Sequence, residues 1–348
     1  MIRQFSLAVL LVLAAGPARA AIPAEQDDCL GCHTDQTQTF DLPSGEKLPL
    51  GISQEAFAKS VHGATLRCTD CHADKTSDHA TGTLKYKTRR DATKAYFEAC
   101  RGCHFANYTK GLDGVHFAIL SKGNEKVAMC VDCHGAHDIS KASAPRTRIA
   151  NHCAKCHQKE AGIYAQSVHG RVSDQNADVP VCNDCHRAHD QSDPRDGTDL
   201  ALRTPQLCGR CHGNVDLMKK YRLSTSIMTS YLSDFHGMSA TIQKGEKHKH
   251  GDRLAAVCTD CHGIHDIERP SDPKSTAMNA NLQKTCAKCH AGASTSFPKA
   301  WLSHFQPSSE KAPLVWAVQV FYMFMIPFMV LGLVLQIALH LWRTIVNR

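Results

Sequence analysis

The chain has 348 residues and a formal net charge of +7, with 18 cysteines and 22 histidines but only 6% aromatic residues. Between the two ends of the chain, Gly, Pro, Asp and Ser interrupt the apolar runs. This composition excludes conventional layered domains with large apolar cores. Apart from the positive charge, the sequence has no feature typical of nucleic-acid binding, so we expect no nucleic-acid partner.

The first 20 residues predict an export signal. Arg3 precedes an apolar run from Phe5 to Ala15, and the small residues Ala18 and Ala20 stand at cleavage-site spacing. We expect cleavage after Ala20, because the apolar run is short for a membrane span. An uncleaved anchor is the alternative. Residues 21–310 would then form one exported domain.

Nine Cys-x-x-Cys-His motifs follow, and they account for all 18 cysteines. This motif attaches c-type haem: two thiols bond to the porphyrin vinyl groups, and the adjacent imidazole lies under the iron. Zinc sites and disulfides are the alternatives, but nine units cannot be paired off, and neither alternative needs a histidine after every pair. The predicted attachment cysteines are Cys29, Cys32, Cys68, Cys71, Cys100, Cys103, Cys130, Cys133, Cys153, Cys156, Cys182, Cys185, Cys208, Cys211, Cys258, Cys261, Cys286 and Cys289. The predicted proximal iron ligands are His33, His72, His104, His134, His157, His186, His212, His262 and His290.

The motifs alternate strictly between two types. Type B motifs carry Asp before the second cysteine, and type A motifs do not. Type B motifs begin at Cys68, Cys130, Cys182 and Cys258, and type A motifs begin at Cys29, Cys100, Cys153, Cys208 and Cys286. The order predicts four two-haem repeats followed by one closing haem.

A further histidine follows each motif with the same rhythm, and these nine histidines are predicted distal iron ligands. After type A motifs they are His62, His116, His169, His236 and His304, each followed by Gly or Phe. After type B motifs they are His79, His137, His189 and His265. An aromatic residue five positions before three of them (Phe57, Tyr164 and Tyr231) suggests a short helix that presents the imidazole.

His137 follows the proximal His134 by only three residues. That is too short for the chain to pass around a porphyrin, so we expect His137 to ligate a neighbouring haem. Sequence does not reveal which haem each distal histidine serves. His152 is the substitute candidate for His79, whereas His248 and His250 are interpreted as part of a solvated basic loop.

Residues 311–348 predict a C-terminal transmembrane anchor with a short cytoplasmic tail. Between Lys311 and Arg343 there are 31 residues without Asp, Glu, Lys or Arg, enough for a tilted membrane-spanning helix. Pro327 lies mid-span, where a kink is tolerated. Trp316 and Trp342 lie near the interfaces, and Arg343 and Arg348 place the C-terminus in the cytoplasm.

Polar residues within this span suggest a membrane partner. Tyr322, Gln336 and His340 fall on one helical face, and such groups usually face a partner or cofactor. His340 could contact a b-type haem. The alternative is an interfacial histidine that reaches the lipid headgroups.

The repeated "SVHG … CxDCHxxHD" pattern resembles that of the multihaem cytochromes c, in particular the superfamily of octahaem reductases and decahaem conduits. The resemblance covers residues 29–304. It implies haems packed closely enough for electron tunnelling. With about 32 residues per haem, we expect the porphyrins to form the interior of a mainly α domain with extensive loops and little or no sheet.

Two functions compete. In the first, nine bis-His haems pass electrons between an integral-membrane quinol-oxidising b-type cytochrome subunit and a soluble periplasmic or outer-membrane carrier. This fits a subunit of anaerobic respiration at the inner membrane that is not itself an enzyme. In the second, one haem with an open distal face reduces or oxidises a small nitrogen or sulfur compound. Matching numbers of distal histidines and irons favour the first, and the direction of electron flow stays open.

Overall fold

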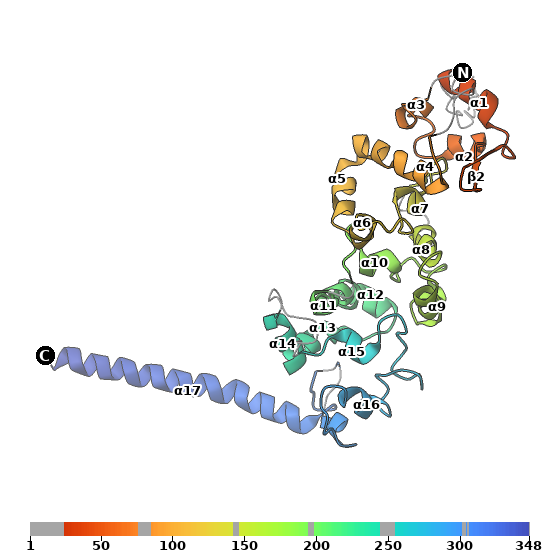
Figure 1. Ribbon diagram of the computed structural model, residues 1–348. Coiled ribbons are helices and arrows are strands. Elements are labelled where there is room, and N and C mark those ends of the chain that lie inside the picture. The colour runs from red at the N-terminus through yellow and green to blue at the C-terminus, as the bar shows by residue number, and fades with distance from the viewer. Residues whose placement is uncertain are drawn as a thin grey trace, which may run out of the picture. The chain divides into compact units, whose positions relative to one another are not determined.

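The computed structural model describes residues 24–75, 85–141, 146–193, 198–243, 255–300, 304 and 306–347. Within these ranges the chain is mostly helical, and the sheet has only two strands (Figure 1). The predicted fold class, mainly α with extensive loops, little sheet and one C-terminal apolar helix, is confirmed. The predicted export signal lies outside the described residues. The chain divides into two compact units: unit 1 is residues 1–158 and 180–191, and unit 2 is residues 159–179 and 192–348.

Unit 1 consists of short helices joined by loops, with one hairpin near its beginning. Its helices are α1 (Ala24–His33), α2 (Gln54–Lys59), α3 (Cys68–Cys71), α4 (Arg89–Ala95), the 3-10 helix η2 (Phe97–Cys100), α5 (Arg101–Leu112), α6 (Val115–Leu120), α7 (Cys130–His134), α8 (Arg146–Ala154) and α10 (Cys182–His186).

The hairpin pairs β1 (Thr39–Asp41) with β2 (Lys47–Pro49) in antiparallel register, with Phe40 opposite Leu48. Gly45 adopts a φ of 83° in the turn and donates its N–H to the Leu42 carbonyl at 2.8 Å. A positive φ is easily adopted only by glycine. The strand side chains are mostly exposed, so the sequence lacks the alternation that marks a half-buried strand.

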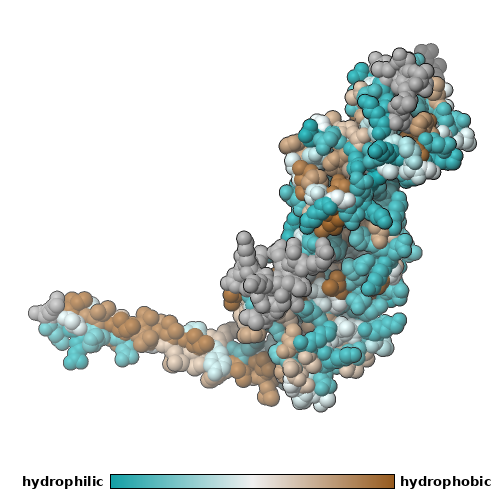
Figure 2. All heavy atoms as spheres, viewed as in Figure 1, coloured by the Kyte–Doolittle hydropathy of each residue, from teal (hydrophilic) through white to brown (hydrophobic). Residues whose placement is uncertain are grey.

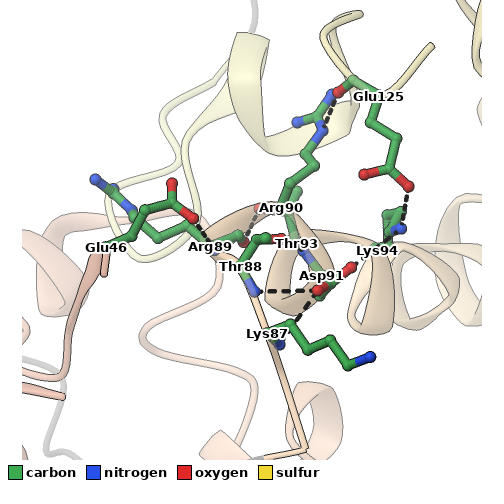
Figure 3. Close-up of polar contacts among 9 residues, drawn as sticks. All are labelled: Glu46, Lys87, Thr88, Arg89, Arg90, Asp91, Thr93, Lys94 and Glu125. Atoms are coloured by element: carbon green, nitrogen blue, oxygen red, sulfur yellow. Dashed lines mark hydrogen bonds and ion pairs between the residues drawn. The ribbon is translucent and has the colours of Figure 1, made fainter. Parts of the chain in front are cut away.

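Helix α4 ties the hairpin to the segment that leads into the motif at Cys130 (Figure 3). Thr88 and Asp91 cap its first turn reciprocally, each accepting the other's backbone N–H at 3.0 Å. On the hairpin side, the Arg89 N–H donates to Glu46 at 3.1 Å. On the other side, the Arg90 guanidinium donates to the Glu125 carbonyl at 2.7 Å and to Asp132 at 2.8 Å.

Unit 2 contains the later helices. They are α9 (Gln158–Gln166, whose first residue belongs to unit 1), the 3-10 helix η3 (Gly170–Val172), α11 (Thr198–His212), α12 (Val215–Lys220), α13 (Ile227–Ser233), α14 (Phe235–Gln243), α15 (Cys258–His262), α16 (Leu282–Cys286), the 3-10 helix η5 (Phe297–Ala300) and α17 (Pro313–Val346).

Buried apolar side chains are few among the residues that the structure describes. In unit 2, Leu202, Ala240, Ala255 and Val257 form a buried cluster. Elsewhere in the described residues, buried apolar side chains occur mostly singly along the chain, as with Leu42 in unit 1. These side chains bury little of the apolar surface whose burial normally stabilises a domain. This agrees with the expectation from the composition that the chain lacks a large apolar core.

Helix α17 is 34 residues long and continues through Pro327. It is long and apolar enough to cross a membrane, and the span is not buried in the structure. Figure 2 shows hydrophobic side chains along most of this helix. The predicted span therefore forms one helix, as a membrane anchor requires.

Candidate functional site: paired histidines beside the cysteine motifs

Type B motifs begin helices, whereas four of the five type A motifs lie at helix ends. Each type B motif begins a one-turn helix (α3, α7, α10 and α15), whereas type A motifs at Cys29 and Cys208 end α1 and α11 at their proximal histidines. The type A motifs at Cys153 and Cys286 start in the last turns of α8 and α16. At Cys100 the motif enters α5, which is kinked at His104.

The aspartate of the type B motif caps its helix. It accepts the backbone N–H of the residue before the first cysteine at 2.6–2.7 Å in all four motifs, through Asp70, Asp132, Asp184 and Asp260. This is the N3 half of a capping box. The aspartate is therefore structural, a role that the sequence pattern alone did not assign.

Seven predicted proximal histidines lie opposite seven predicted distal histidines. The ring centroids of each pair are 6.0–6.4 Å apart. In unit 1 the pairs are His104 with His62, His72 with His137, His157 with His116 and His134 with His189. In unit 2 they are His212 with His169, His290 with His236 and His262 with His304.

This separation fits one iron between two imidazoles. A metal–imidazole bond is about 2 Å long. A ring nitrogen lies roughly 1.1 Å from the centre of a five-membered ring with bonds of about 1.35 Å. Two imidazoles on opposite sides of one iron therefore have centroids about 6.3 Å apart. Rings stacked directly on each other would not require this constant separation between their centroids.

The surroundings of the pairs also fit a large apolar ring. Phe105 and Phe235 stand next to paired histidines, and Ile264 lies two residues after the paired His262. All three side chains are 63–76% exposed, where a porphyrin would cover them. The described residues contain no group of three or more metal-ligating side chains, as a closed zinc site would require. The residues present therefore fit haem better than zinc.

Burial favours the neutral form of several of these imidazoles. It lowers the pKa of His72, His137, His134 and His116, and the neighbouring ring of the same pair adds to the effect at His72, His134 and His116. The pKa of His169 falls to about 4, chiefly through burial. A neutral imidazole is the form that binds a metal ion.

The residues around three of the five type A distal histidines, His62, His169 and His236, form a tight turn. Ser60 is buried, and its hydroxyl accepts the N–H of Gly63 at 3.0 Å. Gly63 packs so closely on Phe57 that an added Cβ would lie 1.9 Å from the Phe57 carbonyl oxygen. Gly170 and Gly237 make the same approach to the carbonyls of Tyr164 and Tyr231.

The aromatic residues do lie in short helices, α2, α9 and α13, as predicted. However, His62 and His169 follow the helix in the turn rather than standing on it. The glycine after the histidine is thus needed for close packing of this turn on the preceding helix.

The chain turns sharply after three of the four type B proximal histidines, His134, His186 and His262. Gly135, Arg187 and Gly263 have φ values of 78°, 61° and 81°, and Asp266 accepts the N–H of Ile264 at 3.1 Å. This turn separates the two histidines of one motif. The ring of His134 faces His189, whereas the ring of His137 faces His72.

The seven pairs do not include His33, His186 or His265, which make other contacts. The Nδ1 atom of His33 lies 2.8 Å from the Leu50 carbonyl oxygen, an arrangement typical of histidines that bind metal through the other nitrogen. His79, His248 and His250 lie outside the described residues. His152 contacts the Asp132 carbonyl at 2.9 Å, and this places it beside the motif at Cys130.

First cysteines of consecutive motifs also meet. A thiol hydrogen bond joins four of the five type A motifs to the type B motif that follows, in the pairs Cys29–Cys68, Cys100–Cys130, Cys153–Cys182 and Cys208–Cys258. The bond to Cys130 lowers the pKa of Cys100 to about 7. Nothing in the motif spacing indicated these contacts, because the paired motifs stand 29 to 50 residues apart.

Comparison with known proteins agrees with this geometry. Residues 12–117 match the family described as outer membrane cytochrome MtrC/MtrF-like, domains II/IV. No curated protein matches the chain, and no solved structure matches it. The matched residues include the first three motifs and His62 and His116. The match supports a multihaem cytochrome c family, and with it c-type haems and electron transfer.

Proposed function

We propose that this protein passes electrons along nine covalently bound c-type haems, each held by two axial histidines. The observation that carries the proposal is the set of seven imidazole pairs at a spacing of 6.0–6.4 Å. In each pair, one ring belongs to a Cys-x-x-Cys-His motif and the other to a predicted distal histidine. The haem group supplies the reversible one-electron chemistry when bound.

Two histidines on each iron favour a carrier over an enzyme. An iron that acts on a small nitrogen or sulfur compound needs an open axial position, and a paired imidazole closes it. Ligation by two histidines without methionine also favours low potentials. A low potential suits electrons that come from, or return to, a membrane quinone pool.

The close contacts between motifs support conduction from one haem to the next. Each thiol pair, such as Cys100 with Cys130, brings the attachment points of two consecutive haems together. Within unit 1, burial and then the nearby Cys100 thiol raise the pKa of Cys71, so the motif at Cys68 also lies near the one at Cys100. Electrons would pass through such closely spaced haems in short steps.

Helix α17 supports a site of action at the membrane. In the proposal it anchors the haem domain on the periplasmic side of the inner membrane, where electrons are exchanged with an integral-membrane quinol-oxidising b-type cytochrome subunit. Tyr322, Gln336 and His340 lie within α17 and are polar groups suited to that partner; His340 would contact its b-type haem. A soluble periplasmic or outer-membrane carrier exchanges electrons at the other end.

Haem quantitation and EPR spectroscopy test the proposal. Pyridine haemochrome assay of the purified protein should give nine haems per chain, and the ferric protein should show low-spin signals only. The double variant Cys286→Ala/Cys289→Ala, which removes one attachment site, should give eight haems. Far fewer than nine haems would refute the proposal. A high-spin haem that binds nitrite or sulfite would instead support the reductase.

A further inference from the structure

The pairs reveal a directional order in the way the distal histidines are used. Distal histidines of type B reach back to the preceding type B motif: His137 faces His72, and His189 faces His134. Distal histidines of type A reach forward to the next type A motif. His62 faces His104, His116 faces His157, His169 faces His212, and His236 faces His290.

His304 departs from this order. It follows the type A motif at Cys286, and residues 305–348 contain no further motif. It faces His262 of the preceding type B motif instead.

We propose that the haems of this chain are ligated in this crossed order. No paired haem then takes its distal ligand from the segment that directly follows its own motif. Each paired haem instead links two histidines that are more than 40 residues apart in the chain. This inference rests on the proposed function, because it assigns ligands to the haems that the function requires. It answers a question that the sequence left open, namely which haem each distal histidine serves.

The backbone holds the crossed segments in place. The N–H of Val61, next to His62, donates to the carbonyl of Ile139, two residues after His137, at 2.8 Å. The N–H of Val115 makes the same bond to the carbonyl of Gln191, two residues after His189, also at 2.8 Å. Each of these backbone bonds therefore joins a segment that carries a type A distal histidine to a segment that carries a type B distal histidine.

This joint has a consequence for haem order. His62 and His137 face the proximal histidines of the motifs at Cys100 and Cys68, which are consecutive in the chain. His116 and His189 likewise face those of the consecutive motifs at Cys153 and Cys130. In the proposed ligation, these backbone bonds and the thiol pairs together bring the haems of unit 1, from the Cys68 motif to the Cys182 motif, side by side in chain order.

The test combines loss of one distal histidine with loss of one haem in the full-length holoprotein. His137→Ala alone should leave one iron with an open position and a high-spin EPR signal. In a Cys68→Ala/Cys71→Ala background, which lacks the haem of His72, His137→Ala should add no high-spin signal. In a Cys130→Ala/Cys133→Ala background, which lacks the haem of His134, the signal should persist.

The opposite pattern, with the signal lost only in the Cys130→Ala/Cys133→Ala background, would show that His137 serves its own motif and would overturn the crossed order. Persistence in both backgrounds would overturn it as well. His248→Ala is the control, since the sequence assigns His248 to a solvated basic loop and not to the predicted iron ligands; it should leave every haem low-spin.

A second pair keeps the test decisive if the first variants do not fold. His189→Ala should lose its high-spin signal in the Cys130→Ala/Cys133→Ala background and keep it in a Cys182→Ala/Cys185→Ala background. The reverse result would overturn the crossed order. Absence of haem from the wild-type protein would refute the proposed function itself, whereas nine haems with the wrong pattern would refute only the ligand assignment.

Discussion

At the scale of single residues, the position that follows a distal histidine such as His169 is sterically restricted to glycine. A Cβ at Gly170 would lie 1.9 Å from the Tyr164 carbonyl oxygen, whereas a Cβ at Gly162, in helix α9, would meet no atom within 4 Å. The two glycines are eight residues apart in the same part of unit 2. They form a matched pair in which only one substitution collides with the backbone.

We therefore expect Gly170→Ala to displace the turn that carries His169. Overpacking of this kind lowers the stability of a protein by about 1–3 kcal/mol. Displacement of the His169 imidazole should leave the iron that His212 ligates high-spin in EPR. Gly162→Ala should keep all haems low-spin and raise stability by up to about 1 kcal/mol, because alanine favours the helix. Equal effects of the two substitutions would show that the close approach is unimportant.

Residue patterns indicate the candidate site most directly where the chemistry is local. The Cys-x-x-Cys-His motif contains both thiols and the proximal imidazole within five positions, so its role could be interpreted directly. The partner of His137 could not be predicted, since His72 is 65 positions away and only tertiary structure brings the rings together. The aspartate of type B motifs, such as Asp132, marked the repeat in the sequence, but its capping role requires the observed helix.

At the scale of elements, helix α4 connects two parts of unit 1 through Arg90 and through an ion pair of Lys94 with Glu125. Arg90 donates to the Glu125 and Val127 carbonyls and to Asp132, and its side chain is only 20% exposed. Neighbouring Arg89 contacts Glu46 through its backbone N–H, a bond that survives truncation of its side chain (Figure 3). The helix thus offers a test of the contact and its control side by side.

Arg90→Ala should destabilise unit 1 by about 1–2 kcal/mol, because two carbonyls and a carboxylate lose a charged donor in a partly solvated site. Arg89→Ala should change stability by less than about 0.5 kcal/mol. Denaturant unfolding followed by Soret circular dichroism would measure both midpoints. Equal midpoints for the two variants would contradict the role given to Arg90.

The elements themselves were predictable to different degrees. The apolar run without charged residues indicated a single long helix, and α17 (Pro313–Val346) is that helix. The hairpin at Thr39–Pro49 could not be foreseen, because its three-residue strands are mostly exposed and carry no period-two pattern. Short helices such as α7 owe their existence to a capping residue and tertiary packing rather than to intrinsic helix propensity.

At the scale of the whole molecule, the sparse apolar packing and the crossed pairs have a common physical reason. Side chains such as Leu202 and Val257 form only a small buried cluster, so the remaining apolar contact in the proposed holoprotein comes from porphyrins. A haem held by two distant segments also replaces the long-range contacts that a larger core would provide. Covalent haem attachment and folding would then be coupled, as metal binding and folding are in small metal-dependent domains.

Separation of the haem domain from its anchor tests that view. A chain ending at Lys311 loses α17, the described helix that is long and apolar enough to cross a membrane, but keeps all nine motifs and every predicted distal histidine. Because those residues form the haem-binding part, the truncated protein should appear in the soluble periplasmic fraction with nine haems and low-spin spectra. Its reduction by membrane quinol should be slower, since collision replaces a tethered partner.

Full-length His340→Ala is the companion variant for this experiment. It keeps the anchor and should stay in the membrane fraction, so a slower reduction by quinol would locate the defect at the contact with the b-type subunit. Unchanged reduction would favour a histidine that merely reaches the lipid headgroups. If the truncated chain instead remained in membranes after a high-salt wash, α17 would not be the anchor, because salt removes proteins held only by surface charge.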